Sequence, residues 1–198
     1  MSTLAAKAYH HGDLRRALIG TARLLVEETG PDKLTLRAVA AHIRVSPAAP
    51  YRHFASRELL LAAVVAEAFH ELADGVDAQS RTDPLTALHA VLAEYVRFAL
   101  RTPQLYRLMF GVGRPHREEH ADVFLAQNRL ESAAAETLHR AAEAGAIAAT
   151  DLDDVLLTLR SLMHGVATWA LDARLSQDQA MAVVRGVLAV MNRGLLPR

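Results

Sequence analysis

Residues 35–54, TLRAVAAHIRVSPAAPYRHF, are typical of two short helices joined by a tight turn. Thr35 is a suitable N-cap, because its hydroxyl can accept a hydrogen bond from a free amide of the first turn. The apolar residues after it recur at the spacing of one buried helical face: Leu36, Val39, Ala40 and Ile43. The stretch therefore predicts a first short helix with one face in a core.

A second helix is predicted over residues 47–53. Ser46 can cap it, and Pro47 at the first helical position loses no hydrogen bond. Ala48 and Ala49 keep its start narrow, and polar side chains follow one turn later: Tyr51, Arg52 and His53. A narrow helix flanked by hydrogen-bond donors can enter the major groove of DNA, so the pattern indicates a helix-turn-helix motif.

The motif supplies a set of candidate DNA contacts. Five residues are expected to lie on phosphates: Thr35, Arg37, Tyr51, His53 and Arg57. Three are expected nearest the bases: Ala48, Ala49 and Arg52. Arg44 and Ser46, in and after the turn, complete the set. Clustering of these polar side chains around one short helix favours DNA contact over ordinary surface positions.

These residues resemble the TetR family of transcriptional regulators. The resemblance covers about the first 70 residues and rests on residues 9–15 (YHHGDLR), 51–54 (YRHF) and 59–61 (LLL). A further motif, residues 163–169 (MHGVATW), resembles a histidine–glycine motif of one TetR subfamily. Family members usually carry glycine in the turn, where this chain has Arg44. A left-handed residue there would cost roughly 1–2 kcal/mol, so either the turn is built differently or Arg44 offsets part of the cost by touching a phosphate.

The resemblance implies a DNA-binding repressor whose helical body binds a small apolar or amphipathic effector. The effector would favour a body conformation in which the two reading helices of a dimer are wrongly spaced for a palindromic operator. A rival class is an architectural or interaction protein that binds DNA without any effector.

The charge distribution agrees with one DNA-facing end. The net charge of the 198 residues is zero, but residues 1–57 carry nine Lys/Arg and four Asp/Glu, a net charge of +5. The remainder is correspondingly acidic, so the basic excess is confined to the N-terminal part. The sequence contains no cysteine, which excludes disulfides and thiolate metal sites and fits a reducing cytoplasm. No apolar run approaches the ~18 residues of a membrane span, and we expect no signal peptide and no membrane partner.

Helical periodicity extends along the whole chain and predicts an all-α fold of about nine helices. The first helix is expected from Asp13 to Gly30, where Pro31 prevents continuation. Residues 1–57 form the predicted DNA-binding domain, and residues 58–198 form a helical ligand-binding and dimerisation domain. Six helices are expected after the motif: about 56–77, 84–100, 103–110, 116–144, 151–175 and 176–194.

One enzyme-like pattern competes with this interpretation. Residues 116–120, HREEH, fit the H-x-x-E-H pattern of inverted zinc peptidases, with His116 and His120 one helical turn apart. The segment is polar on all sides and follows a loop rich in glycine and proline, which favours a solvated helix start. No phosphate-binding loop, dinucleotide fingerprint or nucleophile elbow is present, so we expect no enzymatic activity, no cofactor and no metal site.

The body contains aromatic and apolar residues that suit either a helical core or an apolar ligand pocket between helices. Trp169, the only tryptophan, is either a core residue or part of a pocket wall, and a core position is favoured. Gly165 inside a helix indicates close packing of another helix. The candidate pocket residues are Tyr95, Phe98, Leu105, Tyr106, Met109, Phe110, Phe124, Met163, His164 and Trp169.

The last two helices are apolar on more than one stripe, which is more than a single core face requires. The excess predicts a homodimer in which two helices from each chain form a four-helix bundle. A two-fold dimer also places two reading helices one duplex turn apart on a palindromic site. The candidate interface residues are Leu152, Val155, Leu159, Leu162, Val184, Val187, Leu188 and Met191.

Overall fold

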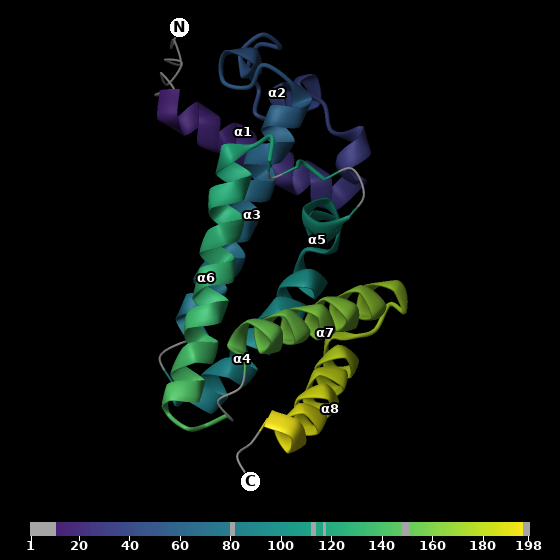
Figure 1. Cartoon of the computed structure of the whole chain (residues 1–198). Coiled ribbons are helices and arrows are strands. Elements are labelled where there is room, and N and C mark those ends of the chain that lie inside the picture. The colour runs from purple at the N-terminus through teal and green to yellow at the C-terminus, as the bar shows by residue number, and fades with distance from the viewer. Residues whose placement is uncertain (1–10, 80–81, 112–113, 117, 148–150, 196–198) are drawn as a thin grey trace, which may run out of the picture. The chain divides into compact units, whose positions relative to one another are not determined.

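The computed structural model describes residues 11–79, 82–111, 114–116, 118–147 and 151–195. Within these ranges the chain forms eight α-helices and two 3₁₀ turns, with no strand, which confirms the predicted all-α class (Figure 1). The chain divides into two compact units, residues 1–64 and 65–198, here called the head and the body. The division falls within helix α3 (Arg57–Gln79), a few residues after the boundary expected from the sequence.

The head is built from α1 (His11–Thr29), a 3₁₀ turn η1 (Pro31–Lys33), α2 (Leu36–His42), a second 3₁₀ turn η2 (Pro50–Arg52) and the start of α3. Helix α1 ends at Thr29 because Gly30 takes a left-handed φ of 83° and Pro31 cannot donate an amide hydrogen. Phe54 is 4% exposed and anchors the core, with the Arg15 guanidinium 5.3 Å above its ring. The other large core side chains of the head are Leu18, Ile19, Val26, Leu34, Leu36, Val39 and Leu60.

The body is organised around α4 (Pro84–Arg101), which packs against α6 (Ala121–Glu143), α7 (Leu152–Asp172) and α8 (Gln177–Leu195). The short α5 (Pro103–Phe110) follows α4 after a break at Thr102. Asp83 caps α4 by accepting hydrogen bonds from the amides of Leu85 and Thr86, at 3.2 and 3.3 Å. No helix in the described part of the chain is both long and apolar enough to cross a bilayer.

Two ion-pair clusters hold the body part of α3. Glu94 of α4 is 9% exposed, and its two carboxylate oxygens accept from Arg97 and Arg101, each at 2.9 Å. Its side chain lies against Gly75 of α3, where an added Cβ would come within 3.2 Å. From α6, the Arg129 guanidinium donates to the carboxylates of Asp74 and Asp77. These contacts raise the pKa of Arg129, and they fix α3 against α4 and α6.

Three helices end with the same backbone motif. After α2, α6 and α7, the amide two residues beyond the helix cap donates to the carbonyl five residues earlier, and the residue before this amide is left-handed. The left-handed positions are Arg44, Gly145 and Arg174, with φ of 58°, 67° and 53°. Glycine adopts this conformation without strain, whereas arginine does not. Two of the three helix ends therefore carry backbone strain.

The predicted start of α6 at His116 or Glu118 was wrong. Helix α6 begins at Ala121, after a turn at residues 118–119, and His120 before it has an extended backbone (φ −130°, ψ 99°). His116 is exposed and lies outside any helix. The two histidines of the H-x-x-E-H pattern therefore do not share a helical face, which the zinc-peptidase interpretation requires.

Candidate functional site

The first helix of the motif has the cap that the sequence predicts. The hydroxyl of Thr35 accepts a hydrogen bond from the amide of Ala38 at 3.0 Å, and Thr35 itself has an extended backbone. Leu36, Val39 and Ala40 are buried in the head, whereas Arg37 is exposed. Helix α2 thus buries its apolar side and leaves Thr35 and Arg37 on the surface.

The turn of the motif is left-handed at Arg44. The amide of Val45 donates to Ala40 at 3.0 Å, and the amide of Arg44 donates to Ala41 at 3.2 Å. The backbone is therefore the turn that glycine usually fills, with an arginine in its place. The Arg44 side chain is exposed, so it is available to a phosphate.

The second segment of the motif is not a continuous α-helix over residues 47–53, and this prediction was wrong. Residues 47–49 form a turn in which the amide of Ala49 donates to Ser46 at 2.9 Å, and the 3₁₀ turn η2 follows. Pro50 explains the difference, because it has no amide to donate to the Ser46 carbonyl in an α-helical bond. The chain therefore turns more tightly than an α-helix through residues 46–53.

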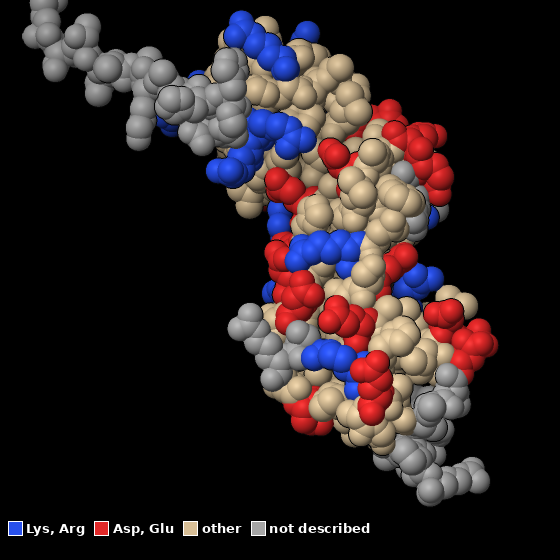
Figure 2. All heavy atoms as spheres, turned by 60° about the vertical axis from the view of Figure 1, so that its left-hand side comes forward, with Lys and Arg blue, Asp and Glu red and all other residues tan. Residues whose placement is uncertain are grey.

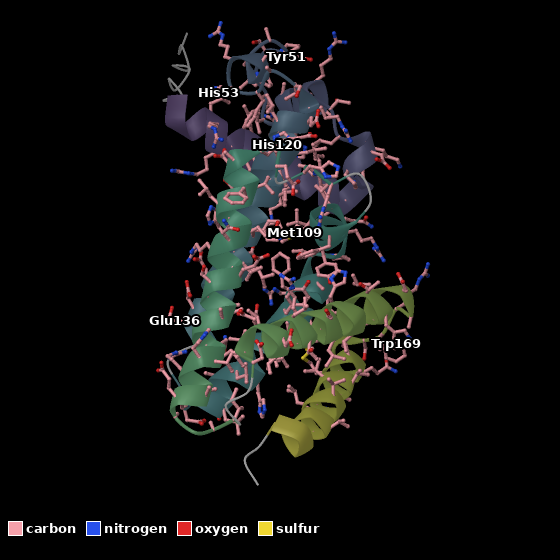
Figure 3. All side chains as sticks on the ribbon, in the orientation of Figure 1. Tyr51, His53, Met109, His120, Glu136 and Trp169 are labelled. Carbon is pink, nitrogen blue, oxygen red and sulfur yellow. The ribbon has the colours of Figure 1, made fainter. Side chains whose placement is uncertain are left out.

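Most of the predicted DNA-contacting residues share the surface of the head. Ser46, Ala48 and Arg52 are exposed, and Ala49 and His53 are half-buried. Tyr51 is 51% exposed although it is a large aromatic residue (Figure 3). Figure 2 shows Lys and Arg side chains gathered on one face of the head, and both signs of charge mixed on the body. A small, exposed segment with polar tips in a basic surface is suited to entering a DNA groove.

Arg57 has a role that the sequence did not reveal. Its Nε donates to the Leu34 carbonyl at 2.9 Å, and one terminal nitrogen donates to the Pro31 carbonyl at 2.6 Å. These carbonyls lie in the turn just before α2, so Arg57 ties the first turn of α3 to the entrance of the motif. The carbonyls around the predicted turn before α2 are the signal in the sequence, but which cation reaches them depends on the tertiary fold.

The body contains a cavity of about 160 Å³ between one face of α5 and one face of α7. Tyr106, Arg107, Phe110 and the following Gly111 form one wall. His164, Thr168, Leu171 and Asp172, at helical spacing on α7, form the other wall. The cavity is aromatic at the rings of Tyr106, Phe110 and His164, whose centroids lie 4.9 to 5.7 Å apart. Arg107 and Asp172, which are exposed and 3.9 Å apart, add a cation and an anion.

A hydrogen-bonded cluster lies behind this wall. The Tyr106 hydroxyl donates to the Tyr95 hydroxyl at 3.3 Å, and the two hydroxyls lie 2.6 and 3.1 Å from His164 Nδ1. Burial raises the pKa of Tyr106 to about 12 and also raises the pKa of Tyr95, so both are neutral donors. Burial lowers the pKa of His164, which favours the neutral ring.

The ten candidate pocket residues separate into three groups. Tyr106, Phe110 and His164 line the cavity, and Tyr95 contacts them from behind. Phe124 and Trp169 are 41% and 54% exposed, so the assignment of Trp169 to a core was wrong (Figure 3). The remaining four are fully buried core residues: Phe98, Leu105, Met109 and Met163. The sequence missed the polar members of the wall, although Thr168 and Asp172 follow His164 at intervals of four.

The candidate interface residues of α7 and α8 differ in how far they are buried within the chain. Leu159, Val184 and Leu188 are buried inside the body, whereas Leu162 is 39% exposed. Leu152, Val155 and Val187 are half-buried, and the side chain of Met191 lies outside the described residues. Other large apolar residues of the two helices are left on the surface: Leu157, Trp169 and Val190.

Gly165 and Gly186 lie on the exposed faces of α7 and α8. An added Cβ at either glycine would meet nothing within 4 Å. Packing against the described residues of the chain therefore does not explain Gly165, and the predicted close packing of another helix stays a prediction.

Two family descriptions match the sequence. "Bacterial regulatory proteins, tetR family" matches residues 18–64, and "Tetracyclin repressor-like, C-terminal domain" matches residues 88–191. Together these ranges contain the helix-turn-helix motif, the α5–α7 cavity, α7 and most of α8.

Three individual proteins are also similar to the chain. The nucleoid occlusion factor SlmA of Sodalis glossinidius is 29% identical over 170 residues, which cover 85% of this chain and 77% of that protein. A solved structure of a protein of unknown function from Rhodococcus sp. RHA1 is 30% identical, with a TM-score of 0.83 over 96% of this chain and all of that chain. A TetR-family regulator from Pectobacterium atrosepticum, 20% identical, shares the fold with a TM-score of 0.76 over 94% of this chain and 96% of its own.

Proposed function

The chain belongs to the TetR family of DNA-binding transcriptional regulators, and from this premise we propose that it is a repressor that binds a palindromic operator as a homodimer and leaves it when a small molecule binds the body. The observation that carries the proposal is the exposed second segment of the motif. It combines small side chains at Ala48 and Ala49 with polar tips at Tyr51 and Arg52.

The proposed DNA contacts fall into two groups, contacts to base edges and contacts to phosphates. The narrow part of the segment allows the backbone near Ala48 and Ala49 to approach base edges, with Arg52 beside it. Tyr51 and His53, together with the residues around the start of α2, hold phosphates on either side. Arg57 acts through its bonds to the Pro31 and Leu34 carbonyls, which keep the entrance of α2 in place.

The homodimer is proposed through the outer face of α7 and α8. Leu162 and Trp169 are exposed there, and Gly165 leaves room between them for a close helix approach. A partner's α7 and α8 on this face complete a four-helix bundle and remove the exposed apolar area from water.

The effector is proposed to act by population shift. It binds the α5–α7 cavity in one conformation of the body better than in the other, so effector and operator oppose each other by the same factor. The cavity favours this function over an architectural role without an effector, because a closely packed helical body has no need of a polar-lined space of about 160 Å³.

Selection from a pool of random duplexes, followed by sequencing, tests the DNA-binding part. We expect a two-fold symmetric motif and an affinity that falls steeply with salt. Arg52→Ala should weaken binding and relax the preference at one position of each half-site, whereas Arg114→Ala, an exposed arginine of the body, should change neither. An Arg52→Ala protein with unchanged affinity and preference would refute the assignment.

Sedimentation velocity tests the dimer. Leu162→Glu places a charge on the proposed interface and should shift the chain to monomer. Leu125→Glu is the matched control, because Leu125 is 62% exposed in the first turns of α6 and is not part of the proposed interface. Equal sedimentation of the two variants would show that the outer face of α7 and α8 is not the interface.

A further inference from the structure

We propose that the outer face of α1 is a second self-interface, which pairs with the same face of another copy of the chain about a two-fold axis. The residues that carry the inference are exposed and follow one another at intervals of four along the helix: Arg16, Gly20, Leu24 and Glu28. The inference concerns a helix of the head and goes beyond the proposed function, which assigns the homodimer to α7 and α8.

The row lies on the side of α1 that faces away from the core of the head. Residues four apart lie one above another on a helix, so the row is a continuous strip of surface. Leu24 projects from its middle and is 57% exposed. The opposite side of the helix is buried through Leu18, Ile19, Ala22 and Val26.

Gly20 leaves a gap beside Leu24. An added Cβ at Gly20 would meet nothing within 4 Å in the described part of the chain. Glycine in the interior of a helix is less stable than alanine, and contacts with the described residues do not offset this cost. The row therefore carries a projecting leucine and, one turn away, a position at which another helix can approach the backbone closely.

Two copies of the row complement each other when they run antiparallel. Position 22 is the midpoint between Gly20 and Leu24, and also between Arg16 and Glu28. A two-fold axis at this level sets Leu24 against the partner's Gly20 and Arg16 against the partner's Glu28. Rows of residues at intervals of four are the ridges by which helices most often pack, and a two-fold interface requires such a self-complementary surface.

Arg16 and Glu28 determine the direction of the pairing. Neither side chain has an interaction with another residue that the structure describes, whereas Arg23 and Glu27 beside the row have interactions of their own. The antiparallel register pairs opposite charges at both ends, and a parallel register would set like charges against each other. Charges at the edge of an interface select the register and the partner more than they add affinity.

The face is small, so the pairing is weak on its own. A standard interface contains about 20–30 residues a side, and one exposed row of a helix supplies far fewer. Where the α7–α8 face forms the homodimer, a consequence that rests on the proposed function, the α1 face joins one homodimer to the next. Homodimers on adjacent DNA sites hold the α1 faces at a high effective concentration, so adjacent sites are occupied cooperatively.

Disulfide trapping without DNA tests the inference, because the sequence contains no cysteine. Gly20→Cys and Leu24→Cys proteins are mixed and oxidised with copper phenanthroline. The mixture should form covalent dimers about tenfold faster than either protein alone, because only positions 20 and 24 face each other and a disulfide requires Cα atoms within about 7 Å. Gly20→Cys mixed with Leu125→Cys is the matched control, since Leu125 is 62% exposed on α6. Equal rates in the mixture and the control overturn the proposal.

Charge reversal tests the register. Arg16→Glu in both cysteine proteins sets glutamate against glutamate at two symmetry-related places and should slow the trapping about tenfold, and Glu28→Arg should do the same. Arg16→Glu combined with Glu28→Arg restores both pairs in reverse and should recover the rate to within about twofold. A combined variant that is as slow as the single variants overturns the antiparallel register.

Leu162→Glu separates this interface from the proposed homodimer. Trapping through α1 should continue in the Leu162→Glu background, although sedimentation velocity no longer detects the α7–α8 dimer. Trapping that disappears in this background would show that α1 is not a separate interface and overturns the inference. Normal trapping together with unchanged sedimentation of Leu162→Glu supports the α1 interface and refutes only the α7–α8 homodimer.

Discussion

Replacing Arg44 by glycine should make the chain more stable than replacing it by alanine, which is the reverse of what glycine does elsewhere in a helical protein. Arg44 is the left-handed residue after α2, with φ of 58°. Both substitutions remove the same guanidinium, so any favourable interaction of that charge with the end of α2 is lost from both. The difference between them isolates the backbone conformation.

The magnitude follows from two opposing terms. A left-handed residue with a Cβ costs about 1–2 kcal/mol, and glycine removes this cost. Glycine also adds freedom to the unfolded chain, which costs about 0.4–1 kcal/mol relative to alanine. The free energy of unfolding of Arg44→Gly should therefore exceed that of Arg44→Ala by about 0.5–1 kcal/mol.

The chain offers an internal control in Gly145, which occupies the equivalent position after α6 with φ of 67°. An added Cβ there has no neighbour within 4 Å, so Gly145→Ala changes only the backbone term. It should destabilise the body by about 0.5–1 kcal/mol. Urea denaturation followed by circular dichroism measures both pairs at constant m-value. If Arg44→Ala equals or exceeds Arg44→Gly, the strain argument is wrong.

Three further predictions concern the Thr35 cap, the Arg57 side chain and the half-buried His164 imidazole. Thr35→Ala should cost about 1 kcal/mol in urea denaturation, and Thr35→Ser should not, because serine still accepts from the Ala38 amide. Arg57→Lys keeps the charge but cannot bond the Pro31 and Leu34 carbonyls in the same way, so the free energy of unfolding should fall by about 1 kcal/mol. The salt dependence of DNA binding should stay the same. A smaller salt slope would mean that Arg57 contacts a phosphate. The folded-state pKa of His164 lies below its ordinary value of 6.5. Its contribution to the free energy of unfolding is therefore fully present above pH 6.5 and is lost as the pH falls through the folded-state pKa. His164→Gln should therefore flatten the decline of stability between neutral and acidic pH, and an unchanged decline would contradict the burial argument.

The parts of the fold that were predicted from the sequence are those that local chemistry determines. Thr35, Asp83 and Asp151 cap helices through bonds to amides two or three residues away, and each is visible in the sequence. Pro31 ends the possibility of helix after Gly30 whatever the rest of the chain does. Such signals place α2, α4 and α7 closely, because donor, acceptor and stop lie within a few residues of each other.

The misplaced elements have local causes as well, but these compete with one another. In the motif, Ser46 and Pro47 favour a helix start, whereas Pro50 removes the amide that an α-helix needs at its fourth residue, and the second effect determines the structure. At residues 116–120 the histidine spacing suits a helix, but the segment contains no apolar stripe to bury, and the helix starts only at Ala121.

The division of the ten pocket candidates shows what periodicity leaves undetermined. Helical spacing indicates which residues share a face, but not whether a neighbouring helix covers that face closely, at a distance, or not at all. Met163 and Trp169 both lie in the residue 163–169 motif, yet the first is 1% and the second 54% exposed. The cavity wall differs from the core in its polar members: His164, Thr168 and Asp172 lie at intervals of four on α7. Burying polar groups against a closely packed helix costs free energy, so a polar stripe flanked by apolar residues is stable where the neighbouring helix stands off and a ligand or water can satisfy it. In this chain that stripe, more than the aromatic residues, distinguishes the cavity wall from the core.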